Sequence, residues 1–146
     1  MTGPLSLKIY LSIPIRNQEQ SYSIENYFKN NDIEILNPCN IVSKGYSYEN
    51  IPLSIANTCW QMIDVSSGVV LFGDYYGRDC AAEIGYAIAK KKPIFPVFFQ
   101  SDLSAFDKDW MIKYFTEEVS FGLEMLVEKI QKKYSYLLNN QDQVVS

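Results

Sequence analysis

Histidine is absent from the 146 residues of this chain. Its absence excludes Ser-His and Cys-His nucleophile pairs, histidine general bases and the commonest protein ligand of zinc and iron. Any catalysis must therefore rest on carboxylates, tyrosines, cysteines, lysines or arginines. A carboxylate nucleophile needs no activating base at neutral pH, whereas Cys80 would depend on a helix N-terminus to become a thiolate.

Other features are scarce as well. The formal net charge is −4, and the only clusters of basic residues are 90–92 and 132–133, so the chain lacks the positive surface that a polymeric nucleic acid requires. Three cysteines without paired spacing indicate a reducing compartment and no metal cluster. No apolar run approaches the roughly 20 residues of a membrane span. We therefore expect a soluble cytoplasmic protein without a metal or an organic cofactor.

Alternating apolar runs and helical periods predict the fold class. Strands are predicted at 7–13, 33–36, 68–73 and 93–99, with a short edge strand at 110–115. Helices are predicted at 21–30, 51–64, 81–90 and 117–136, and a tyrosine-rich loop at 45–50. This order predicts a single-domain α/β fold, a flavodoxin-like or Rossmann-like three-layer sandwich with a mostly parallel sheet of four to five strands. Residues 1–138 would form the domain and 139–146 a polar, frayed tail.

One carboxylate lies among small residues directly after a buried strand and a glycine-containing turn. The segment Asp79-Cys80-Ala81-Ala82-Glu83-Ile84-Gly85 places Glu83 in the first turns of the third helix. Ligands of open α/β sheets bind beyond the carboxyl ends of the strands, so Glu83 is placed for chemistry and is the candidate nucleophile. The alternative is a glutamate that only complements the helix dipole.

The turn after the first strand contains no glycine, so a dinucleotide fingerprint and a Walker loop are both absent. The turn instead offers Arg16, whose fork of donors suits a single phosphate or carboxylate. The alternative is a solvated arginine on a surface loop.

These two segments resemble the nucleoside 2-deoxyribosyltransferase family, including its branch of 2'-deoxynucleoside 5'-monophosphate N-glycosidases. The family's opening strand, of the type Ile-Tyr-(apolar)-Ala-Gly-Pro, is matched by Ile9-Tyr10-Leu11-Ser12-Ile13-Pro14. Its run ending in Glu-(apolar)-Gly-Tyr-Ala is matched by Glu83-Ile84-Gly85-Tyr86-Ala87, followed by Lys92-Pro93-Ile94. The resemblance extends from Lys8 to about Phe99, and the second match is the more specific.

The resemblance implies a reaction and assigns residues to it. Glu83 would attack the anomeric carbon of a 2-deoxyribose and expel the base, and another base or water would then release it. Tyr10, with Ser12 and Pro14 in the matched opening segment, would contact the substrate. Arg16 aligns with an arginine that binds phosphate in the monophosphate-hydrolysing branch, which favours a nucleotide over a free nucleoside. The resemblance also implies a homodimer or higher homo-oligomer, to which 110–115 could supply a contact. The alternative, which we favour, is that Trp110 and Met111 pack in the core.

The chain also departs from the family pattern. An aspartate six residues before the nucleophile usually binds the base, but Gly77 occupies that position here, while Asp79 lies four before. Asp79 or Asp74 is therefore expected to hold the base or assist its departure. The residue that normally steadies the nucleophile falls near Cys59 and Trp60, with Asn57 and Asp64 as imperfect substitutes.

Two other functions fit the same residues. The segment from Cys80 to Glu83 also resembles the Cys-x-x-Glu of TIR domains, which cleave the nicotinamide bond of NAD. The second alternative is a non-catalytic module that binds a nucleotide or a partner protein through its loop tyrosines, Tyr46, Tyr48, Tyr75 and Tyr76.

Overall fold

The computed structural model describes the backbone of residues 7–42, 51–100 and 102–145, and the side chains of 7–41, 52–100 and 102–135. The loop predicted at 45–50, with Tyr46 and Tyr48, lies outside the described residues.

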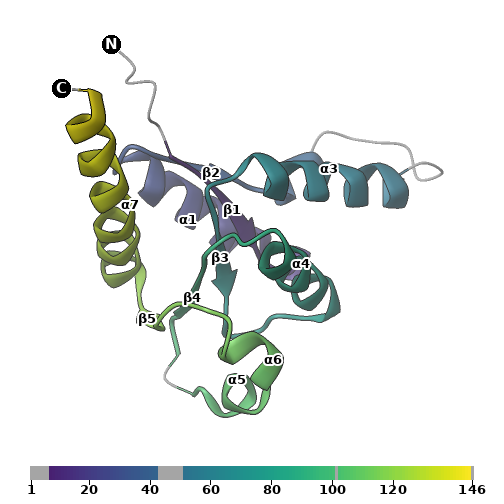
Figure 1. The fold of residues 1–146 in the computed structure, drawn as a ribbon. Helices are drawn as coiled ribbons and strands as arrows, with labels where there is room; N and C mark the ends of the chain where they lie inside the picture. The colour runs from purple at the N-terminus through teal and green to yellow at the C-terminus, as the bar shows by residue number, and fades with distance from the viewer. Residues whose placement is uncertain (1–6, 43–50, 101, 146) are drawn as a thin grey trace.

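A single parallel sheet organises the molecule (Figure 1). Its order is β2-β1-β3-β4-β5, and each neighbouring pair is parallel. The strands are β1 Leu7–Ser12, β2 Ile33–Leu36, β3 Gly68–Phe72, β4 Ile94–Phe98 and β5 Ser120–Phe121. This confirms the α/β class and the three-layer arrangement. The strand order reverses between β1 and β3, and ligands of such sheets bind beyond the carboxyl ends at this reversal.

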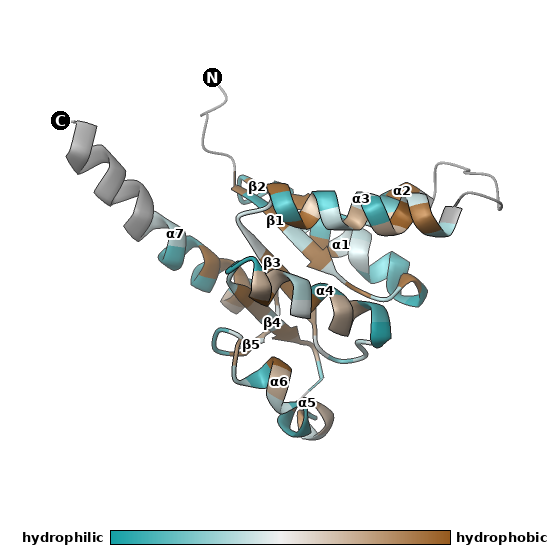
Figure 2. Cartoon of the chain, turned by 45° about the vertical axis from the view of Figure 1, so that its right-hand side comes forward, coloured by the Kyte–Doolittle hydropathy of each residue, from teal (hydrophilic) through white to brown (hydrophobic). Residues whose placement is uncertain are grey.

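Helices cover both faces of the sheet. They are η1 Ile15–Asn17, α1 Gln18–Lys29, α2 Cys39–Val42, α3 Ile51–Val65, α4 Arg78–Ala89, α5 Ser104–Lys108, α6 Trp110–Lys113 and α7 Leu123–Val145. One core cluster joins α1 and α7 to the sheet, and a second joins α3 and α4 to the opposite face. Figure 2 shows the apolar strands between helices of mixed polarity.

The side chains of β1 point alternately to the two faces of the sheet. Ile9 and Leu11 belong to the cluster with α1 and α7, whereas Tyr10 belongs to the cluster with α3 and α4. Side chains alternate along a strand, so Ser12 lies on the same face as Tyr10. The sequence of β1 therefore directs two hydroxyl groups towards α4.

The prediction of an edge strand at 110–115 is wrong. Trp110–Lys113 forms the short helix α6, in which Lys113 N donates to Asp109 O at 2.8 Å and Tyr114 N donates to Trp110 O at 3.1 Å. The edge position belongs to β5, which pairs with β4, so the apolar segment has no neighbouring strand and forms local hydrogen bonds instead. Trp110 and Met111, which we expected in the core, are exposed.

The last helix begins later than predicted. Residues 120 and 121 pair with β4, and Gly122 has a φ of +88° before α7 begins at Leu123. Only glycine adopts that conformation readily, so it separates the strand from the helix. The backbone of α7 then continues to Val145, through most of the segment predicted as a frayed tail. None of the helices described here has the length and apolar character needed to cross a membrane.

Candidate active site

Glu83 lies on the buried stripe of α4. The stripe consists of Cys80, Glu83, Ile84 and Ala87, spaced so that all face the sheet. Only 8% of Glu83 is exposed. The helix begins three residues earlier than predicted, at Arg78, which places Glu83 in its second turn. A carboxylate in the middle of an otherwise apolar stripe requires partners, because burial of an unpaired charge is strongly unfavourable.

Two hydroxyl groups of β1 supply those partners. Tyr10 Oη donates to Glu83 Oε2, and Ser12 Oγ donates to Glu83 Oε1 at 3.0 Å. Tyr10 and Ser12 are themselves fully buried. The sequence predicted both as substrate contacts, whereas in the structure both hydroxyls hold the carboxylate. A residue that steadies Glu83 was expected on the second helix, but Tyr10 and Ser12 hold it instead. Their spacing of two residues along one buried strand was the sequence feature that could have indicated this.

Burial dominates the acidity of Glu83. Removal of water raises its pKa from 4.5 to about 7, while the hydrogen bonds from Tyr10 and Ser12 act in the opposite direction. The charge of Asp79, one turn earlier on α4, adds a further upward shift. At neutral pH the carboxyl group of Glu83 therefore binds a proton much more readily than a carboxyl group in water does.

Glu83 forms part of the wall of a cleft of about 460 Å³. The cleft lies between the loop after β1, the start of α4 and the side of α3, at the position where the strand order reverses. Four other predicted site residues also line it: Pro14, Arg16, Gly77 and Asp79. Its volume lies within the range of small-molecule sites, about 300–1,000 Å³.

The only two arginines of the chain both line this cleft. Arg16 Nη2 donates to the carbonyl of Tyr75 at 2.8 Å, which ties the loop after β1 to the loop after β3. Arg78 is the first residue of α4 and is exposed. Sequence analysis missed Arg78, although its position directly before Asp79 in the singled-out segment could have revealed it. Two guanidinium groups beside one cleft favour an anionic ligand.

Asp74 lies away from the cleft. Its carboxylate accepts the backbone N–H groups of Phe99 and Gln100 at 2.9 and 3.0 Å, so it holds the loop that follows β4. It lines a separate pocket of about 180 Å³. The structure thus places Asp79, but not Asp74, in the same cleft as Glu83.

All three cysteines, Cys39, Cys59 and Cys80, line the cleft as free thiols. Burial raises the pKa of each thiol, so none is poised as a thiolate. This disfavours the cysteine nucleophile that the position of Cys80 allowed. Among the residues that the structure describes, no cluster of His, Cys, Asp or Glu is arranged to hold a metal ion.

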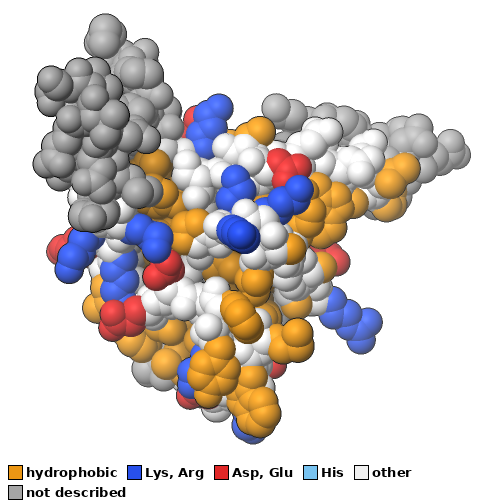
Figure 3. Space-filling model, viewed as in Figure 1, with side chains coloured by type: hydrophobic (Ala, Val, Ile, Leu, Met, Phe, Trp, Pro, Cys, Tyr) orange, Lys and Arg blue, Asp and Glu red, His pale blue; other side chains and the backbone are white. Residues whose placement is uncertain are grey.

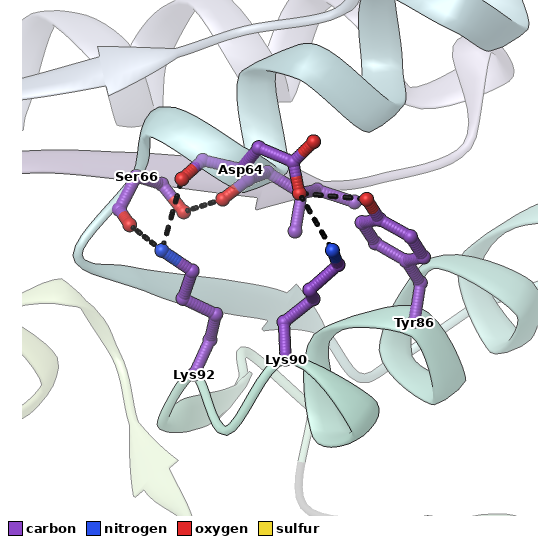
Figure 4. Close-up of polar contacts among 6 residues, drawn as sticks. Asp64, Ser66, Tyr86, Lys90 and Lys92 are labelled. Carbon is purple, nitrogen blue, oxygen red and sulfur yellow. Dashed lines mark hydrogen bonds and ion pairs between the residues drawn. The ribbon is translucent and has the colours of Figure 1, made fainter.

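Polar contacts fasten α4 to α3 (Figure 4). Tyr86 Oη donates to Asp64 Oδ1 at 2.6 Å, and Lys92 Nζ donates to the carbonyls of Asp64 and Ser66 at 3.0 and 2.6 Å. The ring of Tyr86 also packs against Trp60, with centroids 4.7 Å apart. Asp64 therefore accepts a hydrogen bond from Tyr86 of α4 and makes none to Glu83. Its contacts fix the helix that carries Glu83.

Comparison with solved structures relates this architecture to known proteins. A 2-deoxyribosyltransferase from Bacillus psychrosaccharolyticus superposes with a TM-score of 0.69 at 14% identity, over 80% of this chain and 88% of that one. A conserved protein from Enterococcus faecalis V583 gives a TM-score of 0.55 at 17% identity, over 88% and 99% of the two chains. A CMP N-glycosidase from Clostridium botulinum gives 0.52 at 16% identity, over 85% and 98%.

No model of a protein family matches the chain, and a sequence search of characterised proteins finds no match. The structural likenesses nevertheless confirm the fold that the sequence resemblance implied. The chain has the fold of a 2-deoxyribosyltransferase and of a CMP N-glycosidase, two enzymes of the nucleoside deoxyribosyltransferase-like family.

Proposed function

We propose that the protein breaks the N-glycosidic bond of 2'-deoxynucleosides or of their 5'-monophosphates, with Glu83 as nucleophile. The observation that carries this proposal is a buried carboxylate, fixed by two hydroxyl groups, in the wall of a cleft at the strand-order reversal. The likeness in fold to a 2-deoxyribosyltransferase and to a CMP N-glycosidase supports the reaction class.

In the first step, an oxygen of ionised Glu83 forms a bond to C1' of the sugar. The bond between C1' and the base breaks, and its electron pair leaves with the base. The transition state resembles an oxocarbenium ion, which a nearby carboxylate stabilises before the covalent bond is complete. Because Tyr10 and Ser12 each hold one oxygen, the carboxylate is positioned before the sugar arrives.

In the second step, water or the nitrogen of another base attacks C1', the bond between C1' and Glu83 breaks, and its electron pair returns to the carboxylate. The attacking water or base loses a proton to the group that protonated the departing base. Water gives hydrolysis, and a base gives transfer of the deoxyribosyl group. Asp79 lies one turn before Glu83 and lines the same cleft, so it is the candidate to bind the base or to supply its proton. Gly77 and Pro14 would contact the ligand through the backbone and the ring, respectively.

The two arginines favour a substrate with a phosphate at the 5' end. Arg16 comes from the loop after β1 and Arg78 from the start of α4, so both lie at the rim of the cleft that contains Glu83. A guanidinium group binds phosphate oxygens in a bidentate manner, and each charged hydrogen bond contributes about 1.5–3 kcal/mol. We therefore rank the 5'-monophosphates above the free nucleosides.

A substrate panel tests the proposal. Deoxynucleosides and their 5'-monophosphates are incubated with the protein, with and without a free acceptor base, and released and exchanged bases are separated by chromatography. NAD is included because the Cys80 to Glu83 segment also fits a TIR-like glycohydrolase. We expect base release from a deoxynucleoside or deoxynucleotide, and its loss in Glu83→Gln. Nicotinamide release from NAD alone would replace the proposal by the TIR-like activity, and binding without any turnover would replace it by the binding module.

A further inference from the structure

A second cavity lies on the opposite face of the sheet from Glu83. It has a volume of about 180 Å³ and lies beyond the ends of β3 and β4, beside α1 and the start of α7. Its wall includes Phe72, which belongs to the core cluster formed with α1 and α7, whereas α4 packs against the other face. It shares no lining residue with the cleft that contains Glu83. We refer to this cavity as the α1–α7 pocket.

Aromatic side chains form much of the wall of the α1–α7 pocket. Phe72, Tyr75 and Phe99 line it, together with the aliphatic side chains of Ile24 and Leu123. The rings of Phe72 and Phe99 have centroids 5.8 Å apart and are tilted by 34°, so they form two adjoining walls rather than a parallel stack. Tyr75 and Phe99 are about half exposed, so a ligand can reach their rings.

Among the described residues that line the pocket, only Asp74 is charged. Its carboxylate accepts the backbone N–H groups of Phe99 and Gln100, which are neutral donors and leave a further acceptor position on each oxygen. Figure 3 shows several acidic side chains beside basic ones on the face in view. Asp74 differs from these, because no lysine or arginine forms an ion pair with it within the side chains that the structure describes.

A carboxylate among aromatic rings favours an organic cation as the ligand. Aromatic rings attract cations through their quadrupole, and quaternary ammonium groups are recognised by sites of this kind. An anion would meet the carboxylate and no basic residue, and a metal ion would require several oxygen ligands in place of apolar walls. The size also agrees, because a cavity of about 150 Å³ holds benzene, which has more heavy atoms than a trimethylammonium group.

We propose that the α1–α7 pocket binds a small molecule with a methylated ammonium group. The positive charge would lie against Asp74, and the methyl groups would contact Phe72, Tyr75 and Phe99. This inference depends on the lining residues and their charge, and it does not rest on the proposed reaction.

Two probes of the same shape test the requirement for a positive charge. Choline carries a trimethylammonium group, and the neutral alcohol used beside it carries a tert-butyl group in the same place. Each is titrated into the ¹⁵N-labelled full chain at constant ionic strength, so that general screening by salt is the same in both titrations. The amide resonances of Phe99 and Gln100 report on binding, because both amides donate to Asp74. We expect a saturable shift with choline, with a dissociation constant on the order of 1 mM, and at least about tenfold weaker binding of the alcohol.

A matched pair of variants tests the aromatic wall. Phe99→Leu removes a ring that lines the pocket and is 48% exposed. The control Phe121→Leu makes the same change at a phenylalanine that is 49% exposed and does not line the pocket. Phe99→Leu should bind choline about 3-fold to 30-fold more weakly, with the amide of Gln100 as the reporter, and the control should bind it as the wild type does. Amide resonances outside the pocket that match those of the wild type show that Phe99→Leu is folded.

Three results would overturn the proposal. The first is the absence of a saturable shift in the wild type at about 50 mM choline, a concentration well above the expected dissociation constant. The second is equal binding of choline and the neutral alcohol, a comparison that needs no variant. The third is a folded Phe99→Leu that binds choline as tightly as the wild type.

Discussion

Replacing Glu83 with glutamine removes one ionisable group and keeps the size and planar shape of the side chain. In the folded protein the carboxyl group has a pKa of about 7, raised from 4.5 mainly by burial. Each pKa unit corresponds to 1.36 kcal/mol, so ionised Glu83 destabilises the fold by about 3 kcal/mol relative to a carboxylate in water. Glutamine keeps one acceptor oxygen for one of the two hydroxyl groups of Tyr10 and Ser12, and its amide nitrogen can donate to the other if that O–H turns away. It never carries the charge of Glu83.

The direction of the pH dependence follows from the raised pKa. The folded state binds the proton of Glu83 more tightly than the unfolded state does, so this group stabilises the fold most at low pH. Its contribution falls as the pH rises from about 4.5 to about 7 and is constant above that range. As the pH rises across this interval, the free energy of unfolding of Glu83→Gln should therefore increase by about 3 kcal/mol relative to that of the wild type.

Urea unfolding at a series of pH values between 4 and 9 measures this difference, with tryptophan fluorescence as the signal. Other groups titrate as well, but they are common to both proteins and cancel in the difference. Glu34→Gln serves as the control, because it makes the same chemical change at an exposed position of β2. The burial argument would be refuted if the difference in free energy of unfolding between the wild type and Glu83→Gln changed by less than about 0.5 kcal/mol over this pH range. Such a change corresponds to less than half a pKa unit.

Four further predictions concern the site and its supports. Tyr10→Phe removes the donor to Glu83 Oε2, so the acid limb of the pH profile of base release should move to higher pH; an unchanged limb would show that this hydrogen bond does not stabilise the carboxylate. Arg16→Ala and Arg78→Ala should each raise KM for a 5'-monophosphate by about 10-fold to 100-fold and leave KM for the nucleoside unchanged. Lys108→Ala is the control outside the cleft, and equal effects on both substrates would contradict phosphate binding. Asp74→Ala should lower the free energy of unfolding by about 1–3 kcal/mol through two lost backbone partners and leave kcat unchanged, whereas a large loss of kcat would support the catalytic role predicted from sequence. Gly73→Ala should destabilise the fold by about 1–3 kcal/mol in chemical denaturation, because the added Cβ would lie 2.3 Å from Phe98 Cζ. The control Gly85→Ala, whose added Cβ would meet nothing within 4 Å, should be neutral or stabilising.

The sequence predicted those features that depend on local pattern. Short apolar runs predicted β2 at its observed bounds and the other three main strands to within one residue at each end. The place of Glu83 near the start of α4 was predicted from the order of buried strand, glycine-containing turn and helix. Spacing along one strand or one helix was sufficient for both conclusions.

Features that depend on tertiary partners could not be predicted in this way. The carboxylate of Asp74 looked equivalent to that of Asp79, and only the position of the loop after β4 shows that two backbone amides bind it. The segment from Trp110 to Phe115 has strand-like composition, but β5 occupies the sheet edge and leaves that segment to form a helix. The pKa of Glu83 likewise depends on burial between α4 and β1, which no local pattern specifies.

The two hydroxyl partners of Glu83 affect the proposed steps in opposite ways. Hydrogen bonds from Tyr10 and Ser12 stabilise the carboxylate, and this makes Glu83 more often ionised but a weaker nucleophile in the first step. In the covalent intermediate the oxygen bound to C1' no longer carries a full charge, so the same hydrogen bonds become weaker. They strengthen again when water or a base displaces the carboxylate, which makes Glu83 a better leaving group. Donors on both oxygens therefore suit a carboxylate that must leave again. A general base acts by accepting a proton from water and would gain nothing from donors that occupy both oxygens.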